Sequence, residues 1–340
     1  MTIKRWPFDR KGPPKKPNAK KILAGLAAAL SLTAMQSTAA VEPLQTSGNQ
    51  ILVGNQAKAL GGHSLFWHNV PAAGSLYNAD TVSRLKNDWN SKVIRAAIGI
   101  EVPFNSENTY IGNKGSSLAA IDRVVNAAVA NDMYVIIDFH THHAEDNIGE
   151  AITFFSEMAQ LYGHHDNVIF EIYNEPLNTT SWGTIKHYAE QVIRAHSDNL
   201  IVVGTRTWSQ NVDEAAFDKI NDSNTAYALH FYVGSHGNHV RNPAQTALNN
   251  GAAIFASEWG IWPNNNYDGM NADDWMNFLD QNKISWANWA ISDKVDPNTS
   301  QLEPPSMFNP DGSLSSSGQY VVNKLNEYAA QAPWRQAIAN

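Results

Sequence analysis

The segment 168–177 reads VIFEIYNEPL. Its first six residues are largely apolar, as in a strand that is buried on both faces, and the polar sequence Asn174-Glu175-Pro176 follows directly. Glutamate is seldom buried without a partner, so a glutamate at the end of such a strand belongs either to an ion pair or to a reactive site. The segment therefore predicts a buried strand and a candidate catalytic residue.

Seven more apolar runs of similar length lie before and after this one, and successive runs begin 26 to 41 residues apart. That spacing suits one strand plus one helix. The intervening residues support helices, because Ile152, Phe155, Met158 and Ala159 share one face of segment 150–162. Eight repeats predict a single closed (β/α)8 TIM barrel, an α/β fold, with an open doubly wound sheet as the weaker alternative. The expected strands are 60–67, 93–100, 134–139, 168–173, 200–205, 226–232, 253–257 and 285–291.

Three helix starts are indicated by residues that favour the first position of a helix. Ser117 and Asn271 have side chains that accept hydrogen bonds from the free N–H groups of a first helical turn. Asn242 followed by Pro243 fits a capping residue and a first helical residue. We therefore expect helices to begin after Ser117, Asn242 and Asn271.

The first forty residues differ in composition from the rest of the chain. Eight basic side chains precede the apolar segment 22–32, and small residues follow it at 37–40. This order is typical of a secretory signal peptide, and the apolar segment is too short to span a bilayer. We expect residues 1–40 to be cleaved, which leaves 41–340 as the (β/α)8 catalytic domain of a protein secreted to the periplasm or the medium.

The chain without its first forty residues is strongly acidic. Those residues hold eight of the 24 basic and one of the 32 acidic side chains, so the remainder has a formal charge of −15. Such a charge repels nucleic acid and anionic lipid and favours a neutral partner. The absence of cysteine excludes disulfides and a lipid anchor on cysteine. We expect a soluble monomer that binds neither nucleic acid nor, after cleavage of the signal, a membrane.

Polar and aromatic residues recur at the C-terminal ends of the expected strands, where the catalytic side chains of such barrels gather. Asp138 and Glu171 lie inside buried strands instead, and we expect them to pair with neighbouring groups rather than act on a substrate. The residues of this kind that lie on or shortly after the expected strands are Arg95, His140, Asn174, Glu175, Trp208, His230, Tyr232, Glu258 and Trp289.

Two carboxylates on opposite walls of a barrel mouth suit the cleavage of a glycosidic bond. One acid protonates the leaving oxygen while the other attacks the anomeric carbon. Arg95 and Tyr232 are the candidates to keep the attacking carboxylate ionised. We expect the negative charge of that nucleophile to raise the pKa of the acid, so that the acid holds its proton near neutral pH.

At these residues the chain resembles glycoside hydrolase family 5, specifically the bacterial endo-β-1,4-glucanases (cellulases). One departure is Phe139, where the family often has Trp, and we expect it to alter packing rather than catalysis. The resemblance rests on segments that span the barrel in order: 93–97 (VIRAA), 134–140 (YVIIDFH), 168–177 (VIFEIYNEPL), 208–210 (WSQ), 229–237 (LHFYVGSHG), 255–260 (FASEWG) and 285–294 (SWANWAISDK).

The resemblance implies a role for each matched position. Glu175 would be the general acid/base and Glu258 the nucleophile of a retaining, endo-acting hydrolase of β-1,4-glucan. Asn174 would bind the sugar 2-hydroxyl group, and Arg95 and Tyr232 would orient the nucleophile. The other positions would contact the sugar: His140, His230 and Trp289 at the cleavage subsite, His63, Trp67 and Lys294 on the non-reducing side, and Trp208 on the leaving-group side.

Alternatives remain for the substrate and for the chemistry. The same mechanism could act on β-mannan, xyloglucan or mixed-linkage glucan, because specificity resides in the outer subsites. A non-catalytic sugar-binding barrel is disfavoured because both glutamates are present. The sequence His140-Thr141-His142-His143 offers a His-x-His pair for zinc in a metal-dependent hydrolase. That pair tends to lie on the first strand in such barrels and here follows the third, so we expect no metal and no cofactor.

Overall fold

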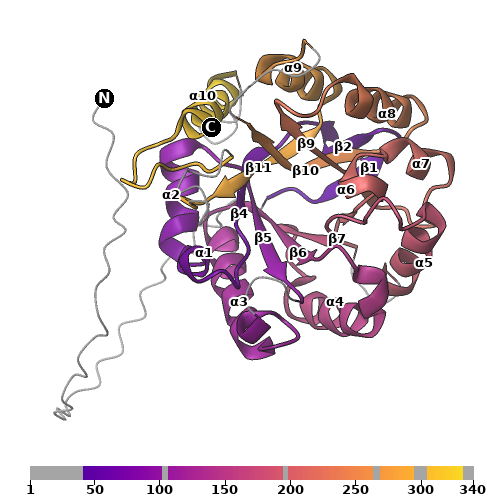
Figure 1. The fold of residues 1–340 in the computed structure, drawn as a ribbon, viewed down its shortest axis with the longest axis horizontal. Helices are drawn as coiled ribbons and strands as arrows, with labels where there is room; N and C mark the ends of the chain where they lie inside the picture. Colours follow the sequence, from indigo (N-terminus) through magenta and orange to yellow (C-terminus); the bar gives the residue numbers. More distant parts are fainter. Residues whose placement is uncertain (1–40, 102–105, 194–197, 263–268, 295–304, 332–340) are drawn as a thin grey trace, which may run out of the picture.

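The computed structural model describes residues 41–101, 106–193, 198–262, 269–294 and 305–331. The expected signal peptide, residues 1–40, lies outside the described residues (Figure 1). Within these ranges no helix combines the length and the apolar character that crossing a bilayer requires.

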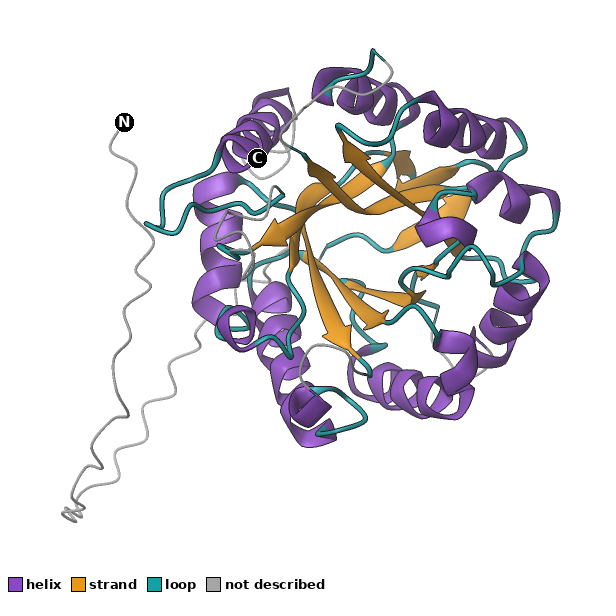
Figure 2. Ribbon diagram, viewed as in Figure 1, coloured by secondary structure: helices purple, strands orange, loops and turns teal. Residues whose placement is uncertain are grey.

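Eight parallel strands form a closed barrel, and helices surround it (Figure 1, Figure 2). The order around the barrel is β10-β11-β4-β5-β6-β7-β8-β9, and β9 pairs with β10 to close it. The (β/α)8 prediction is confirmed, and the open sheet is excluded. The strands are β4 (Gly61–Leu65), β5 (Val93–Gly99), β6 (Tyr134–His140), β7 (Val168–Tyr173), β8 (Ile201–Val203), β9 (Thr225–Val233), β10 (Ile254–Ile261) and β11 (Ser285–Ile291).

The helices cover the outside of the barrel and shield its strands from water (Figure 2). Two 3₁₀ turns, η1 (Ser106–Asn108) and η2 (Ala144–Asn147), follow β5 and β6. The described helices are α1 (Pro71–Gly74), α2 (Ala79–Trp89), α3 (Lys114–Ala130), α4 (Ile148–Tyr162), α5 (Trp182–Ile193), α6 (Arg206–Ser209), α7 (Val212–Phe217), α8 (Asn238–Asn249), α9 (Ala272–Asn282) and α10 (Ser316–Gln331).

The interior of the barrel changes from apolar to charged along its axis. Val93, Ile136 and Ile169 belong to one apolar cluster. Side chains alternate along a strand, so the residues two positions later point to the same interior. Those residues are Arg95, Asp138 and Glu171, all fully buried. The apolar layer therefore supports a charged layer that lies nearer the mouth.

A small antiparallel sheet adds to the barrel and was not predicted. It consists of β1 (Leu44–Ser47), β2 (Gln50–Val53) and β3 (Gln56–Ala57). Leu44, Ile51 and Val53 pack with the apolar cluster inside the barrel. The amide of Asn224 binds both the Leu44 carbonyl oxygen and the Thr46 N–H, at 3.0 and 2.9 Å. The sheet therefore covers the end of the barrel opposite the charged layer.

One of the three expected helix starts is confirmed and two are wrong. Asn271 caps α9 in a reciprocal arrangement with Asp274. Asn113, not Ser117, caps α3, and the Ser117 hydroxyl lies 2.8 Å from Nε2 of His68. Helix α8 already begins at Asn238 and contains Pro243 within it. Both predictions placed the start of the helix too late. Ser117 and Asn242 favour the position before a helix, but here they lie inside α3 and α8.

Candidate active site

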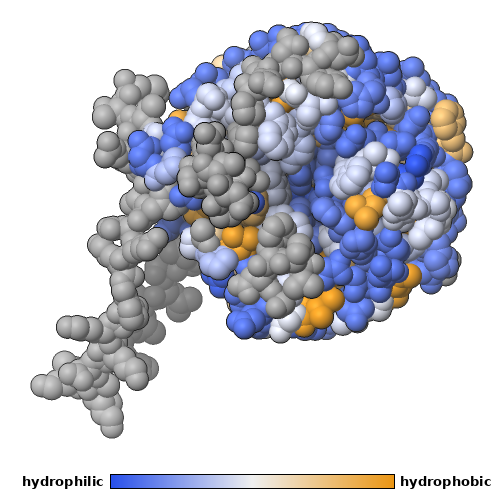
Figure 3. All heavy atoms as spheres, in the orientation of Figure 1, coloured by the Kyte–Doolittle hydropathy of each residue, from blue (hydrophilic) through white to orange (hydrophobic). Residues whose placement is uncertain are grey.

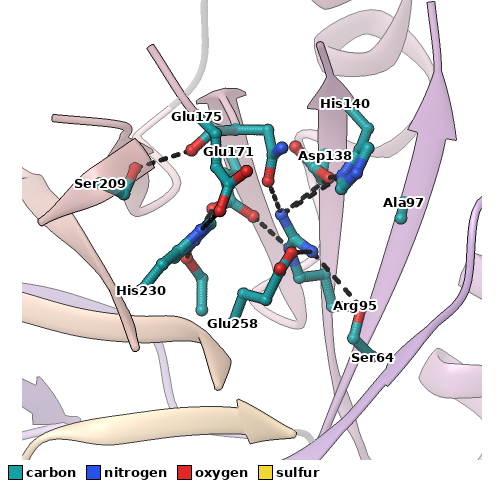
Figure 4. A network of polar contacts seen from close by, with 12 residues as sticks. Ser64, Arg95, Ala97, Asp138, His140, Glu171, Glu175, Ser209, His230 and Glu258 are labelled. Carbon is teal, nitrogen blue, oxygen red and sulfur yellow. Dashed lines mark hydrogen bonds and ion pairs between the residues drawn. The ribbon is translucent and has the colours of Figure 1, made fainter. Parts of the chain in front are cut away.

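Arg95 is the centre of the charged layer at the barrel mouth (Figure 4). Its Nε donates to Oε2 of Glu171 at 2.6 Å, and Nη1 donates to Oε2 of Glu258 at 3.1 Å. Its Nη2 donates to Oδ1 of Asn174 at 2.6 Å and lies 2.9 Å from Oδ2 of Asp138. One guanidinium therefore holds four residues that lie on or directly after three other strands, β6, β7 and β10. The prediction that Asp138 and Glu171 pair with neighbours is confirmed.

The guanidinium stays charged despite its burial. Taking such a group out of water costs several kcal/mol unless opposite charges surround it. Burial alone would lower the pKa of Arg95, but the charges of Asp138, Glu171 and Glu258 outweigh it and raise the pKa above its ordinary value. Arg95 is thus a fixed positive charge over the whole working range of pH.

Glu258 lies on β10 and receives donors from two sides. Its Oε2 accepts from Arg95, and its Oε1 accepts a hydrogen bond from the Tyr232 hydroxyl of β9. Burial and the negative charge of Glu175 raise the pKa of Glu258, while His230, Arg95 and Tyr232 oppose that rise. Both carboxylate oxygens are therefore held by donors that stabilise the anion.

Glu175 follows β7 and lies between two imidazoles. Nδ1 of His230 is 2.9 Å from its Oε1, and Nε2 of His142 is 3.1 Å from its Oε2. On the far side of the His230 ring, Nε2 lies 3.0 Å from the Ser257 hydroxyl, which donates to Glu171 at 2.5 Å. A chain of hydrogen bonds thus connects Glu175 to the Arg95 network. The contact of His142 with Glu175 was not predicted, although His142 belongs to the histidine-rich segment that could offer a pair for zinc.

The expected rise in the pKa of Glu175 is wrong for the free site. Burial would raise the pKa, but hydrogen bonds from His142 and His230 outweigh it and lower the pKa to about 2. For His230, burial lowers the pKa, but the nearby carboxylate of Glu171 and the hydrogen bond to Glu175 raise it to about 9. In the free site the proton therefore resides on imidazole nitrogen, one hydrogen bond away from the carboxylate.

Glu175 and Glu258 approach each other across the mouth. One ligand atom from each of Glu175, His230 and Glu258 lies within 4.8 Å of the others. A cation could be held by such a trio only if it displaced the His230–Glu175 hydrogen bond and competed with Arg95.

The His140/His142 pair, which the sequence offered for zinc, is divided between different partners. Nδ1 of His140 lies 2.5 Å from Asp138, whereas His142 binds Glu175.

Aromatic rings form one wall of the site beside His140. The Trp289 ring of β11 is stacked on the His140 ring with 5.4 Å between centroids, and Trp67 meets the same imidazole edge-on at 4.2 Å. Phe66 lies 5.0 Å from Trp289, and Nζ of Lys294 lies 4.7 Å above the Phe66 ring. The structure therefore places Trp67, Trp289 and Lys294 along this wall.

A cleft of about 460 Å³ extends from Glu175 in the other direction. Figure 3 shows this face of the molecule as largely hydrophilic around a central hollow. Trp208 lines the cleft and is 38% exposed. The backbone N–H of Trp208 donates to the carbonyl oxygen of Pro176, the residue after Glu175, at 2.8 Å. Trp208 lies within the run 207–209, where φ is positive at each residue, and such local strain concentrates at functional sites.

His63 is the one predicted site residue that the structure does not bring to the cleft. Ser64 points into the barrel, where its hydroxyl lies 3.4 Å from Nη1 of Arg95. The alternation of the strand then directs His63 outward. It is fully buried against Trp89 of α2, and its Nδ1 lies 3.2 Å from the Ser91 hydroxyl. Counting the alternation from Ser64 could have revealed this orientation.

The family model described as Cellulase (glycosyl hydrolase family 5) matches residues 46–295. Endoglucanase Z of Dickeya dadantii is 47% identical over 89% of this chain and 71% of its own length. Endoglucanase A of Evansella cellulosilytica is 40% identical over 82% of this chain. The chain spans 58% of that second relative.

Solved structures of the same fold match the chain almost over their full length. A protein from Cytophaga hutchinsonii aligns with a TM-score of 0.76 at 41% identity, over 85% of this chain and 96% of its own. The cellulase Cel5C_n aligns with a TM-score of 0.73 at 30% identity, over 84% and 92%. The catalytic domain of Thermobifida fusca endoglucanase Cel5A (E5) aligns with a TM-score of 0.72 at 29% identity, over 84% and 97%.

Proposed function

Because the chain belongs to the cellulase family, glycosyl hydrolase family 5, we propose that it is an endo-β-1,4-glucanase that retains the anomeric configuration. The observation that carries this proposal is the pair formed by Glu175 and Glu258 at the barrel mouth, with oxygens within 4.8 Å of each other. Retaining glycosidases hold their two carboxyl groups about 5–5.5 Å apart, whereas inverting enzymes leave room for a water molecule at about 6.5–9.5 Å.

In the first step Glu258 attacks the anomeric carbon and Glu175 protonates the oxygen that leaves. The product is a glycosyl ester on Glu258 together with a free sugar hydroxyl on the departing chain. Arg95 and Tyr232 support this role of Glu258, because both donate to its carboxylate and neither is deprotonated near neutral pH.

In the second step a water molecule attacks the ester, and Glu175 takes its proton. This restores the carboxylate of Glu258 and leaves Glu175 protonated for the next cycle. Glu175 must hold a proton when substrate is bound, although the free site places that proton on an imidazole. A glycosidic oxygen that accepts a hydrogen bond from Glu175 favours the protonated carboxyl group and so returns the proton to it.

Asn174 stabilises the transition state through the sugar 2-hydroxyl group. Its Oδ1 accepts from Arg95, which fixes the orientation of the amide. Its Nδ2 is buried and has no hydrogen-bond partner among the described residues. A buried donor without a partner costs about 1–3 kcal/mol, and a hydroxyl group of the bound sugar removes that cost.

Sugar units bind on both sides of the scissile bond, which supports endo cleavage. Trp67, Trp289 and Lys294 contact the units on the non-reducing side, with Trp289 and His140 at the cleavage subsite. Trp208 contacts a unit on the leaving-group side, where the cleft continues past Glu175. Aromatic rings suit this purpose because a large flat apolar face packs well against the C–H face of a sugar.

The protein acts outside the cytoplasm as a soluble enzyme. The support is the composition of residues 1–40, in which basic residues, a short apolar segment and small residues follow in the order of a signal peptide. The formal charge of −15 on the rest of the chain suits a neutral polysaccharide better than a polyanion.

The products formed from cellohexaose test the activity and its stereochemistry together. We expect internal cleavage into shorter cello-oligosaccharides whose new reducing ends appear first as the β-anomer in ¹H NMR spectra. Matched assays on β-mannan, xyloglucan and mixed-linkage glucan should give lower kcat/KM values. Products that appear first as the α-anomer, or a preference for mannan, would contradict the proposal.

A further inference from the structure

The loop that follows β6 supplies a second imidazole to Glu175. His142 lies two residues beyond the end of the strand, and its Nε2 donates to Oε2 of Glu175 at 3.1 Å. The other oxygen, Oε1, already has His230 as its partner at 2.9 Å. Each oxygen thus has its own imidazole, and the carboxylate cannot rotate without breaking one of the two hydrogen bonds.

The loop is held in place by groups other than the His142 imidazole. The hydroxyl of Tyr173, on β7, donates to the His142 carbonyl oxygen at 2.9 Å and also contacts the carboxylate of Glu145. Thr180 donates to the other oxygen of Glu145 at 2.8 Å. Thr141, beside His142, donates to Glu101 at 2.5 Å. Hydrogen bonds therefore hold the backbone on both sides of His142, and removal of the imidazole alone should leave that backbone in position.

The three side chains differ in their access to water. The side chain of His142 is 37% exposed, that of Glu175 is 14% exposed and that of His230 is 1% exposed. His142 thus forms the solvent side of the trio, and His230 its buried side.

We propose that His142 is a positioning residue for the acid/base, which it holds against His230 in the rotation required for proton transfer to the leaving oxygen. This inference rests on the proposed function, because it assigns a task to His142 only if Glu175 is the acid/base. The orientation of a catalytic carboxyl group contributes to the rate because proton transfer needs a short and well-aligned hydrogen bond.

The charges around His142 support the same assignment. The groups that face His142 are Glu175 after β7, His230 on β9, Glu258 on β10 and His140 at the end of β6. Burial lowers the pKa of His142, but the hydrogen bond and charge of Glu175 raise it above its ordinary value. Burial raises the pKa of Glu175, and the hydrogen bond from His142 is the strongest of the effects that oppose it.

Aryl β-cellobiosides with different leaving groups separate positioning of the acid from a structural role. Phenol is a poor leaving group that needs the proton from Glu175, whereas 2,4-dinitrophenol leaves without it. For His142→Ala we expect kcat/KM on phenyl cellobioside to fall about tenfold. On 2,4-dinitrophenyl cellobioside the variant should remain close to wild type, because that step needs no acid.

The pH profile gives a second readout. Loss of the imidazole removes a hydrogen bond and a positive charge that stabilise the Glu175 anion. The proton that Glu175 shares with His230 is then held more tightly, and the alkaline limb of kcat/KM on phenyl cellobioside moves to higher pH by about one unit. His142→Gln keeps a neutral N–H donor and should recover most of the rate. His143→Ala is the matched control, because His143 is adjacent and exposed, and it should behave as wild type.

Two results would overturn the inference. One is a His142→Ala variant with the wild-type rate and alkaline limb on phenyl cellobioside. The other is an equal loss on both aryl cellobiosides, which would indicate a structural role. Glu175→Ala separates these from a failure of the proposed function: if that variant still cleaves phenyl cellobioside at the wild-type rate, Glu175 is not the acid/base at all.

Discussion

The two sides of the barrel mouth hold the same kind of side chain by different means. Glu258 is bound by a guanidinium that cannot lose its proton and by a tyrosine hydroxyl whose pKa lies well above its ordinary value. Glu175 is bound by two imidazoles, one of which has its pKa raised to about 9. The partners of Glu258 keep their protonation states near neutral pH, whereas the partners of Glu175 are imidazoles, which can gain or lose a proton.

This difference fits the two roles that the family resemblance implies. A nucleophile has to remain ionised, so donors that never titrate near neutral pH serve it best. An acid/base has to gain and lose a proton in each cycle, so partners that titrate in the same range serve it best. The environment, and not the residue type, therefore decides which glutamate performs which step.

The largest effect is expected when the permanent charge is removed from the nucleophile side. Arg95→Lys cannot bind Glu171, Glu258 and Asn174 at once, because an ammonium lacks the planar set of donors. We expect kcat to fall more than a thousandfold and the free energy of unfolding to fall by about 3 kcal/mol, since buried carboxylates lose their partner. Steady-state kinetics and urea unfolding measure the two losses. A variant with near-wild-type kcat would show that Arg95 is only a structural ion.

A smaller effect is expected at Asn174, which lies between the two sides. Asn174→Ala removes the Nδ2 donor, and kcat should fall about hundredfold with little change in KM, because the contact strengthens in the transition state. A 2-deoxyglucosyl substrate lacks the hydroxyl group in question, and on it the wild type and the variant should differ far less. An equal loss on both substrates would place the role of Asn174 in the Arg95 network instead.

The smallest effect concerns stability as a function of pH. The pKa of His230 rises from 6.5 to about 9 in the folded protein. The pairing of the His230 imidazolium with its carboxylates therefore stabilises the fold fully below pH 6.5, and this stabilisation is lost as the pH rises through 9. Glu175→Gln removes much of that pairing. The difference in Tm between wild type and this variant should therefore shrink by a few degrees between pH 6.5 and 9.

Tyr232→Phe is the control on the nucleophile side for the same experiment. The pKa of Tyr232 lies well above 10, so its hydroxyl does not titrate between pH 6.5 and 9. Its difference in Tm from wild type should stay constant in that interval. A Glu175→Gln difference that is equally constant would show that the two sides do not differ in the way described.

The sequence predicts the barrel and both carboxylates because each depends on local pattern. Buried apolar runs at regular spacing fix eight strands, and polar residues at their ends converge at one mouth whatever the details of the loops. Glu175 and Glu258 meet for that reason. The sheet formed by β1, β2 and β3 was missed because its strands are short and mixed in polarity.

The remaining features depend on orientation in space. His142 lies in a loop whose backbone is held by Tyr173 of β7 and, through Thr141, by Glu101 in the segment after β5, and no periodicity reveals these contacts. The pKa of Glu175 was predicted with the wrong sign for the free site because that second imidazole was not foreseen. His63 shows the opposite case, since the alternation along β4 was sufficient to direct it away from the cleft.

Covalent trapping with 2,4-dinitrophenyl 2-deoxy-2-fluoro-β-cellobioside tests the central assignment most directly. The fluorine slows both steps and the activated leaving group restores the first, so the glycosyl ester should accumulate. Mass spectrometry of peptides from the inactivated enzyme should find the label on Glu258, and Glu175→Ala should still be labelled. A label on Glu175, or no ester on either glutamate, would contradict the account.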